Sequence, residues 1–383
     1  MDAHATTETR SAAYFLLEGL TEIGVDYLFC NFGTDHAPII EELANRRKRG
    51  EPVPKTIRCA HENTAAHMAG GYALVTGRGQ GVLVHVDVGT ANTANAMHNL
   101  FRSRIPVLLM AGKAPFTTSD ELLGGRDHYI HFVQEPFDQG SLVRPYVKWE
   151  WTLPSGIVVK EALRRAHSIM RSQPQGPVNL MMQREMLAQE WNGSEIRSYG
   201  AERFGPAARG VADPEHVAKL AEHLLTAQSP IMITAYGGRN PNTSQGISSL
   251  AEFAGIAVYE ASMVNNTVQV VGDGSFYFNN PSSVYAASRQ YKLPILTIVL
   301  DNSGWGAVKE ATLRVFPDGE AKDTGEYEAT LCPNVEFGKV AEAFGAYAET
   351  LSDPHDVPAA LRRCVDQVRG GRTALLHVRV TPI

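Results

Sequence analysis

The sequence predicts an α/β protein whose parallel sheets carry helices on both faces. Short apolar runs of strand length alternate along the chain with amphipathic segments of helix length, which is the order that strand-helix-strand units produce. The strand-length runs are apolar throughout, as in strands that are buried on both faces. With 383 residues, 44% of them hydrophobic and 20% charged, the chain has the composition of a globular protein of two or three domains.

Residues 1–190 show this alternation most regularly, and we expect them to form one α/β domain. Apolar residues at helical spacing predict helices at 11–24, 37–49, 61–76 and 91–102. Continuous apolar runs predict strands at 27–30, 55–60, 81–88 and 105–111.

The rest of the chain is expected to hold two further α/β regions, both incomplete. Residues 191–266 are a polar, glycine-rich linker followed by a partial unit, in which Asp213 caps a helix that has Pro214 in its first turn and runs to Ala227. Strands at 230–235 and 257–260 and a helix at 244–255 complete this unit. Residues 267–383 form the last region, with strands at 268–271, 295–300 and 373–380 and helices at 281–291, 335–344 and 357–368.

Composition excludes several classes of function. The net charge of -6 gives no electrostatic footprint for nucleic acid or for an anionic membrane. No apolar stretch is long enough to span a bilayer, and the charged first twenty residues do not read as a secretory leader. The four cysteines lack metal-binding spacing, so we expect reduced thiols in a cytoplasmic protein and no structural zinc site.

The strongest chemical signal is a pair of polar turns after two neighbouring strands. Gly272-Asp273-Gly274 follows one strand, and Asp301-Asn302-Ser303-Gly304 follows the next. A right-handed crossover brings the carboxyl ends of both strands to one edge of the sheet, where ligands bind. A carboxylate, an amide oxygen and a backbone carbonyl suit Mg²⁺, and glycines let a phosphate approach the backbone. The alternative is two unrelated turns, which is the usual reading of a short motif alone.

A second signal is a helix start whose first turn carries Glu62. One face of this helix holds only small residues (Ala65, Ala66, Ala69, Gly70 and Ala73), which allows close packing against another backbone or a flat ligand. The simpler interpretation is that Glu62 complements the helix dipole.

Together these motifs resemble those of the thiamine-diphosphate-dependent enzymes of the acetolactate synthase, pyruvate decarboxylase and benzoylformate decarboxylase group. The resemblance covers nearly the whole chain. It implies a pyrimidine-binding domain at 1–190, a truncated central domain at 191–266 and a truncated diphosphate-binding domain at 267–383. It also implies the following roles: Asp273, Asn302 and the Gly304 carbonyl as Mg²⁺ ligands, Glu62 as the catalytic glutamate that contacts the pyrimidine ring, Gln134 facing the site, and Gly272, Gly274, Ser275 and Asn92 beside the cofactor.

The resemblance further implies a lyase or transferase that acts on a 2-oxo acid by decarboxylation, with or without carboligation. Since such sites form between subunits, it implies a homodimer or homotetramer. FAD, which some relatives carry in the central domain, has no support in this sequence.

The chain departs from the family in length and in its pocket loops. Family members are roughly one and a half times as long, which implies an internal gap near Asn265-Thr267, either a physical loss or a segment missing from the sequence. The loops place His36, His85, Asp87 and His128 where they could line a substrate pocket, although for each residue singly a satisfied loop or core position is the more frequent case. We expect His36, next to Asp35, to act as an acid or base near neutral pH.

Two other functions stay open at this point. If the gap is physical, the chain could be a catalytically inactive thiamine-diphosphate-binding remnant or scaffold. An unrelated Mg²⁺-dependent phosphoryl-transfer enzyme could also use Asp273.

Overall fold

The computed structural model describes the chain except for residues 1–7, 119–120, 209, 261–268 and 382–383. The chain divides into two compact units, one made of residues 1–58 and 65–265 and the other of residues 59–64 and 266–383. The expected gap near Asn265-Thr267 lies outside the described residues. No described helix is long and apolar enough to cross a membrane.

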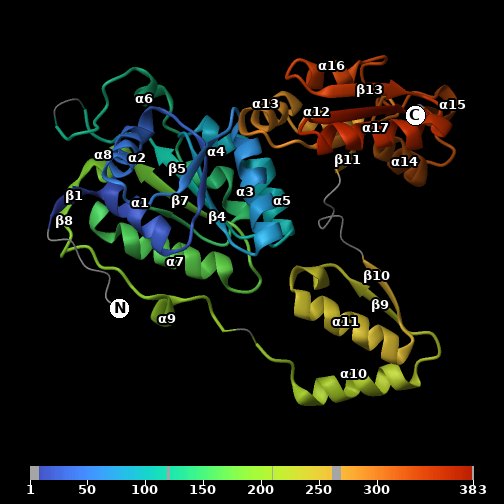
Figure 1. Cartoon of the computed structure of the whole chain (residues 1–383), viewed down its shortest axis with the longest axis horizontal. Helices are drawn as coiled ribbons and strands as arrows, with labels where there is room; N and C mark the ends of the chain where they lie inside the picture. Colours follow the sequence, from blue (N-terminus) through green and yellow to red (C-terminus); the bar gives the residue numbers. More distant parts are fainter. Residues whose placement is uncertain (1–7, 119–120, 209, 261–268, 382–383) are drawn as a thin grey trace. The chain divides into compact units, whose positions relative to one another are not determined.

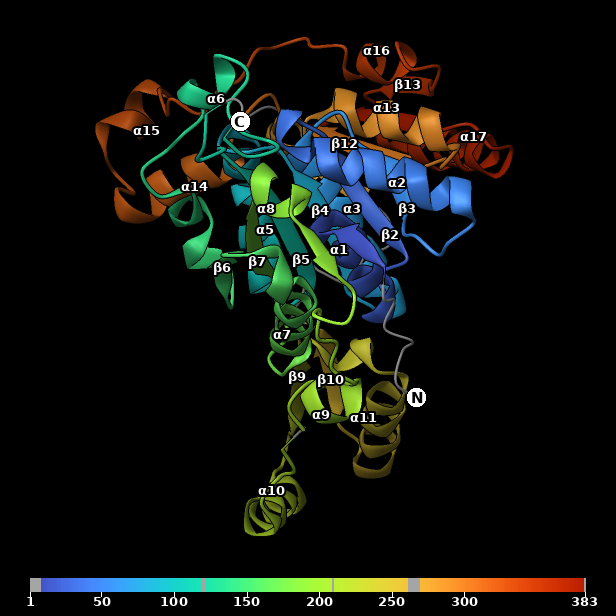
Figure 2. The same ribbon diagram turned by 90° about the vertical axis from the view of Figure 1, so that its left-hand side faces the viewer.

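A six-stranded parallel sheet in the order β3-β2-β4-β5-β7-β6 forms the centre of the first unit. Figure 2 shows these strands side by side, from β3 on the right to β6 on the left. The strands are β2 (Tyr27–Asn31), β3 (Lys55–Arg58), β4 (Gln80–Val84), β5 (Val107–Lys113), β6 (Glu150–Thr152) and β7 (Val178–Gln183). A separate antiparallel ribbon joins β1 (Thr9–Ser11) to β8 (Glu190–Asn192).

Helices cover both faces of this sheet, which confirms the predicted fold class (Figure 1). One face carries α1 (Ala12–Glu22), α2 (Ala37–Arg49), α7 (Val159–Arg171) and α8 (Arg184–Ala188), and their apolar residues join those of the strands in one core. The other face carries α3 (Glu62–Thr76), α4 (Val88–Asn92) and α5 (Ala94–Arg102). The short α6 (Ile130–Val133) lies in the connection between β5 and β6.

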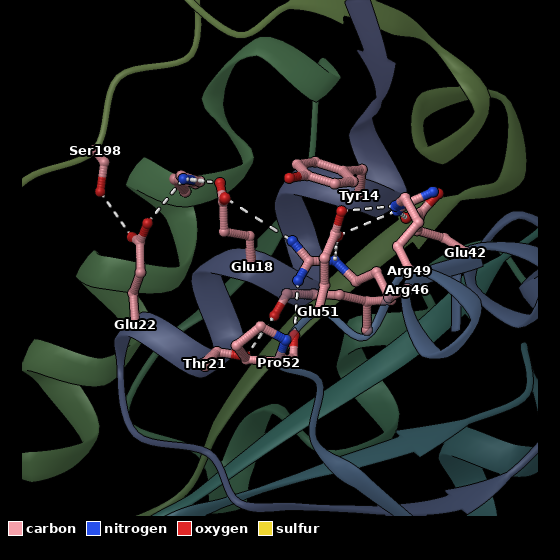
Figure 3. Close-up of polar contacts among 12 residues, drawn as sticks. Tyr14, Glu18, Thr21, Glu22, Glu42, Arg46, Arg49, Glu51, Pro52 and Ser198 are labelled. Carbon is pink, nitrogen blue, oxygen red and sulfur yellow. Dashed lines mark hydrogen bonds and ion pairs between the residues drawn. The ribbon is translucent and has the colours of Figure 1, made fainter. Parts of the chain in front are cut away.

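A network of charged side chains ties the helices of the first face together (Figure 3). The buried Arg46 of α2 lies 3.8 Å from Glu18 of α1 and 3.7 Å from Glu51, and its guanidinium stacks on the ring of Tyr14. Lys160 of α7 pairs with Glu18 and also with Glu22 of α1. The two buried cations of this network, Arg46 and Lys160, therefore both have carboxylate partners, which is the condition for tolerating buried charge.

Two elements differ from their predicted bounds in a way that matters for the site. The strand expected at 81–88 ends at Val84, and it could not have continued through Asp87, whose φ of 57° lies outside the strand region. The helix expected at 91–102 is divided at Thr93 into α4 and α5. Valine alternates with polar residues in 84–88, and this pattern predicts a strand, whereas the chain turns there.

The remainder of the first unit is a small α/β piece with little core. It comprises α9 (Ala201–Phe204), α10 (Pro214–Thr226), β9 (Ile231–Thr234), α11 (Pro241–Ala254) and β10 (Ala257–Glu260), and β9 pairs with β10 in parallel. Asp213 caps α10 by accepting from the Glu215 N–H, as predicted. Apolar side chains of α10 and α11 such as Leu225 and Phe253 are exposed, so this piece buries little of its own apolar surface.

The second unit is a four-stranded parallel sheet in the order β11-β12-β14-β13. Its strands are β11 (Gln269–Gly272), β12 (Leu296–Asp301), β13 (Tyr347–Leu351) and β14 (Ala374–Arg379). Residues of α12 (Asp273–Phe278), α13 (Pro281–Tyr291) and α16 (Phe337–Glu342) pack on one face, and α17 (Val357–Arg369) packs on the other. Two further helices, α14 (Gly306–Val315) and α15 (Glu320–Thr324), follow the β12 turn.

Candidate functional site

Two neighbouring strands of the second unit end side by side and bring the predicted polar turns together. In the parallel pairing of β11 with β12, Gly272 lies opposite Leu300, so Asp273 and Asn302 follow the same edge of the sheet. Asp273, Asn302 and Gly304 line one open cavity of about 700 Å³. The same cavity is lined by Gly272, Gly274, Ser275 and Trp305.

The carboxyl group of Asp273 is buried without a positive partner. Asp273 is 2% exposed, and among the described residues it forms no ion pair. Burial raises the pKa of Asp273, and the neighbouring Asp301 adds to the rise, while backbone N–H groups of Gly274 and Gly304 partly offset it. A divalent cation in the cavity would supply the positive charge that this carboxylate lacks.

The loop after β12 is held by hydrogen bonds from its backbone N–H groups. Ser303 adopts a left-handed φ of 60°, which reverses the chain between Asn302 and Gly304. The Gly304 N–H donates to Asn302 Oδ1 at 3.2 Å. The Trp305 N–H donates to the carbonyl of Ala329 at 2.8 Å, which ties the loop to the segment that runs beside it.

Trp305 packs directly against the glycine that follows Asp273. A Cβ atom on Gly274 would lie 2.8 Å from Trp305 Cδ1, so only glycine permits this contact. A Cβ atom on Gly272 would meet nothing closer than 3.9 Å. The two glycines around Asp273 therefore differ: Gly274 serves packing, whereas Gly272 leaves backbone open to the cavity.

The donor set in this cavity fits a hard divalent cation. A carboxylate and an amide oxygen, with a backbone carbonyl nearby, match the oxygen ligands of Mg²⁺, which takes its remaining ligands from water and phosphate. Within the described residues there is no cluster of three or more His, Cys, Asp and Glu side chains that could hold a metal ion. A soft or imidazole-bound metal therefore finds no such site in the described part of the chain.

Glu62 is the first residue of α3 and is buried, with its Oε2 3.9 Å from His61 Nδ1. The small face of α3 serves packing within the domain. Ala65, Ala66 and Ala69 are fully buried, and a Cβ atom on Gly70 would lie 2.3 Å from Leu100 Cδ2 of α5. The close approach that the small residues allow is thus made to a neighbouring helix.

We expected His36 to line a substrate pocket, but the structure buries its side chain in the core of the domain. His36 is 0% exposed, its Nδ1 accepts from the Gly33 N–H at 3.0 Å, and burial lowers its pKa. The acid–base role of His36 stays a prediction, and its burial argues against direct contact with a substrate. The side chain of His85, which is 17% exposed, lies at the end of β4 with its Nδ1 2.5 Å from Asp35 Oδ1.

Asp35 organises this cluster at the end of β2 and β4. Burial alone would raise the pKa of Asp35, but the charges of His36 and His85 and the hydrogen bond from His85 outweigh it and lower the pKa. Asp35 Oδ2 also accepts from the Val86 N–H at 3.1 Å. A Cβ atom on Gly112 would lie 1.3 Å from that oxygen, so glycine at 112 makes room for the carboxylate.

The other predicted residues of the N-terminal half lie on separate elements. Gln134 follows α6 and is half-buried, and its Oε1 has no hydrogen-bond partner within the described structure. Asn92 is exposed at the end of α4, and Asp87 occupies the turn before it. His128 is exposed and stacks on Tyr129 with ring centroids 4.5 Å apart.

Sequence reasoning missed the residues that support the β12 loop. Trp305 was not singled out, although it lines the cavity. Behind the loop, Asp301 Oδ2 lies 2.9 Å from His377 Nε2, and both side chains are buried. A histidine within the apolar run Leu375-Leu376-His377-Val378 was the available signal.

Comparisons with known proteins give matches to family models and to curated relatives. The model described as thiamine pyrophosphate enzyme, N-terminal TPP binding domain, matches residues 10–142, and the corresponding C-terminal TPP binding domain matches residues 243–378. An acetolactate synthase of Arthrospira platensis is 25% identical over 280 residues, which are 72% of this chain and 44% of that protein. A benzoylformate decarboxylase of Pseudomonas aeruginosa is 26% identical over 226 residues, 58% of this chain and 38% of that protein. The chain thus covers less than half the length of these curated relatives.

Solved structures share the fold. The thiamine diphosphate-dependent 4-hydroxybenzoylformate decarboxylase of Rhodococcus jostii RHA1 superposes with a TM-score of 0.71 at 14% identity, covering 98% of this chain and 100% of that chain. A putative thiamin diphosphate-dependent enzyme of Mycobacterium smegmatis gives a TM-score of 0.70 at 15% identity, with the same coverage. At these identities the likeness concerns the fold alone.

Proposed function

Because this chain belongs to the thiamine pyrophosphate enzyme family, we propose that it is a thiamine-diphosphate- and Mg²⁺-dependent enzyme that decarboxylates a 2-oxo acid, with or without carboligation. One observation carries the proposal: a buried carboxylate without a cation, Asp273, shares a cavity with the side chain of Asn302 at the ends of two parallel strands. The relatedness to acetolactate synthases and to decarboxylases supports this reaction class.

In this proposal the second unit holds the metal and the diphosphate. Asp273 and Asn302 provide side-chain oxygens to Mg²⁺, and Gly304 provides its carbonyl. Gly272 lets the diphosphate approach the backbone, since no neighbouring atom crowds its Cα. Asp301 stays outside the ligand set, because it does not line this cavity and its carboxylate is hydrogen-bonded on the other side, to His377 and to the Ser303 N–H.

In the first half of the chain, Glu62 is proposed to contact the pyrimidine ring of the cofactor and to exchange a proton with it. When bound, the cofactor supplies an electron sink for the carboxylate's bonding electrons, while the protein supplies position and electrostatics. The Asp35–His85 pair is our candidate proton carrier in this half of the chain, since the carboxylate fixes the orientation of the imidazole. His85 then replaces His36 as the candidate acid or base.

Further parts of the proposal concern assembly and location. We propose a homodimer or homotetramer, because Glu62 and the cavity of Asp273 belong to domains that pair between subunits in the resemblance given above. All four cysteines are free, which favours a reducing, cytoplasmic setting. The 2-oxo acid itself is proposed only as a class.

The test is thermal unfolding with thiamine diphosphate and Mg²⁺, alone and together, followed by a decarboxylation assay on a panel of aliphatic and aromatic 2-oxo acids. Ligand at a hundred times its Kd stabilises the folded state by about 2.7 kcal/mol, which gives a clear rise in Tm. We expect the rise only with both ligands present. A nucleotide that stabilises the protein where thiamine diphosphate does not would overturn the proposal in favour of phosphoryl transfer.

A specific observation also favours the inactive remnant as a second candidate. β11 lies at an edge of its sheet, and the exposed fractions of Val270 on this strand and of Phe278 on α12 are 51% and 69%. Apolar side chains at an unpaired edge are what an incomplete sheet would leave. Joint binding of thiamine diphosphate and Mg²⁺ without turnover of any 2-oxo acid would identify this case, and an intact-mass measurement would show whether the native chain is longer.

A further inference from the structure

A buried polar pair lies directly behind the loop that carries Asn302 and Gly304. Asp301 Oδ2 accepts from His377 Nε2 at 2.9 Å, and the His377 side chain is fully buried. The two residues project from the same face of the sheet, because Val299 of β12 lies opposite His377 of β14 and Asp301 is two positions further along β12.

The second oxygen of Asp301 reaches the loop itself. Asp301 Oδ1 accepts from the Ser303 N–H at 2.8 Å and lies 3.4 Å from the Ser303 hydroxyl. Ser303 is the residue whose left-handed φ of 60° turns the chain between Asn302 and Gly304. Such a φ is unfavourable for serine, and it persists only when its surroundings fix it. The Asp301 carboxylate is the side chain that makes this connection.

The far side of His377 is also fixed. Its Nδ1 lies 3.3 Å from Thr350 Oγ1 on β13, and its ring meets the edge of Phe337 at a centroid distance of 5.1 Å. A neutral ring with its proton on Nε2 satisfies both polar contacts, since Nδ1 then accepts from the threonine hydroxyl. A chain of contacts thus runs from β13 through β14 to the loop after β12.

Fold stability alone does not explain this arrangement. Beside its two polar partners, His377 has apolar surroundings: Phe337 lies against its ring, and Val299 and Leu375 belong to the same core. Replacing a buried polar pair by apolar residues of similar size is often neutral or stabilising. A leucine at 377 would pack in that core. The stability of the core therefore does not require a histidine at this position.

We propose that Asp301 and His377 are positioning residues, which hold the Ser303 turn so that Asn302 and Gly304 face the cation. This inference rests on the proposed Mg²⁺ and thiamine diphosphate site. Residues that orient metal ligands from behind typically alter metal affinity about 10–100-fold when they are replaced.

The experiment compares the full-length protein with Asp301→Ala, His377→Leu and the double variant. Calorimetric titration of Mg²⁺ into the protein at saturating thiamine diphosphate gives the Kd for the metal. We expect each variant to weaken Mg²⁺ binding at least about tenfold. In the double variant no buried partner is left unpaired, so its Tm should recover relative to the single variants while its Mg²⁺ affinity stays low.

Ser288→Ala is the matched control. Ser288 Oγ lies 2.5 Å from Thr373 Oγ1, which precedes the opposite end of β14, so this variant also removes a buried hydrogen bond from the same unit. We expect it to lower Tm and to leave the Kd for Mg²⁺ unchanged within about twofold, as for sites that do not couple. His377→Gln, which keeps a side-chain donor, should restore part of the affinity that His377→Leu loses.

Hydrogen exchange of the ligand-free protein tests, without any cofactor, whether Asp301 and His377 hold the Ser303 turn. We expect the amides of Ser303 and Gly304 to exchange faster in Asp301→Ala and in the double variant than in wild type or Ser288→Ala. If wild type binds no thiamine diphosphate with Mg²⁺, the proposed function fails, and exchange at these two amides still judges the positioning role. Unchanged exchange, or wild-type Mg²⁺ affinity in the double variant, would overturn the inference.

Discussion

Asp273 and Asn302 follow neighbouring parallel strands and line the same cavity, with Gly272 opposite Leu300 in the strand register. Two helices, α12 and α13, and the strand β12 lie between them in sequence, so the sheet edge itself brings them together. The carboxylate is buried there without a cation partner among the described residues, and burial raises its pKa. A site that binds a cation is expected to be strained in this way before the cation arrives.

The first prediction is that Asp273→Asn stabilises the ligand-free protein and removes its response to Mg²⁺. The amide keeps an acceptor for the backbone N–H groups but carries no buried charge, so we expect a gain of about 1 kcal/mol in the free energy of unfolding. Denaturant titration without metal measures the gain, and thermal unfolding with thiamine diphosphate and Mg²⁺ measures the lost response. Asp318→Asn, at a carboxylate with 91% exposure, should change neither. A destabilised, Mg²⁺-responsive Asp273→Asn protein would contradict the prediction.

The second prediction separates the two glycines beside Asp273. Gly274→Ala places a methyl group 2.8 Å from Trp305 Cδ1 and must move the indole, whereas Gly272→Ala meets nothing within 3.8 Å and has a φ of -73° that alanine adopts freely. We expect Gly274→Ala to lower stability by about 1–3 kcal/mol, as overpacking does, and to shift the total tryptophan emission, to which Trp305 contributes as one of four tryptophans. Gly272→Ala should leave both close to wild type. Equal effects would show that Trp305 does not pack on residue 274.

The third prediction concerns the Asp35 cluster. Gly112→Ala places a methyl group 1.3 Å from Asp35 Oδ2, so the carboxylate must leave its contacts with His85 and the Val86 N–H. We expect a loss of about 3 kcal/mol or more, because a buried charge loses its partners. Gly71→Ala on α3 is the control, since its Cβ meets no atom within 4 Å, and it should gain up to about 1 kcal/mol in helix propensity. Chemical denaturation of both variants gives the comparison.

Long periodic segments with clear ends were predictable from the sequence. The helix expected at 37–49 has those bounds, because Gly50 with a φ of 70° terminates it as a C-cap. The helix at 281–291 and the strand at 257–260 also match their predicted bounds. The meeting of Asp273 with Asn302 could be predicted as well, since it requires only parallel strands and a crossover.

Contacts between distant residues, and backbone geometry at single residues, could not be predicted. The sequence gives no local sign that His36 turns into the core while His85 stays partly exposed. The α12 helix begins at Asp273 itself, although two glycines around that residue indicate a turn. Asp301 and His377 are 76 positions apart, so only the register of β12 with β14 shows that they meet.

The fourth prediction is that one cysteine reacts quickly in the native protein. Cys332 is exposed, whereas Cys30, Cys59 and Cys364 are buried. Burial raises the pKa of Cys59 to about 12 and that of Cys364 to about 11, so neither forms the reactive thiolate at pH 8. Ellman's reagent should therefore release one equivalent rapidly and the remainder only on unfolding. Cys332→Ser should abolish the rapid phase, and a rapid phase that survives this substitution would show that a buried thiol is accessible.

The fifth prediction is a loss of stability in acid that depends on His167. Burial, with the charges of Arg171 and Arg164, lowers the pKa of His167 to about 4, and its Nδ1 has no hydrogen-bond partner within the described structure. The unfolded chain titrates at about 6.5, so between pH 6.5 and 4 the unfolded state binds the proton while the folded state does not. The contribution of His167 to the free energy of unfolding is therefore fully present above pH 6.5 and is lost as the pH decreases toward 4. Allowing for partial exposure of the ring, we expect this group to account for about 2 kcal/mol of the fall.

His167→Gln removes the titrating group and should flatten the dependence of unfolding free energy on pH across this window. His216→Gln is the control, because His216 is exposed on α10 and should leave the wild-type slope unchanged. Urea titrations at half-unit pH steps give the slopes. Parallel curves for wild type and His167→Gln would mean that His167 is protonated in the folded protein, and that water or a carboxylate reaches its ring.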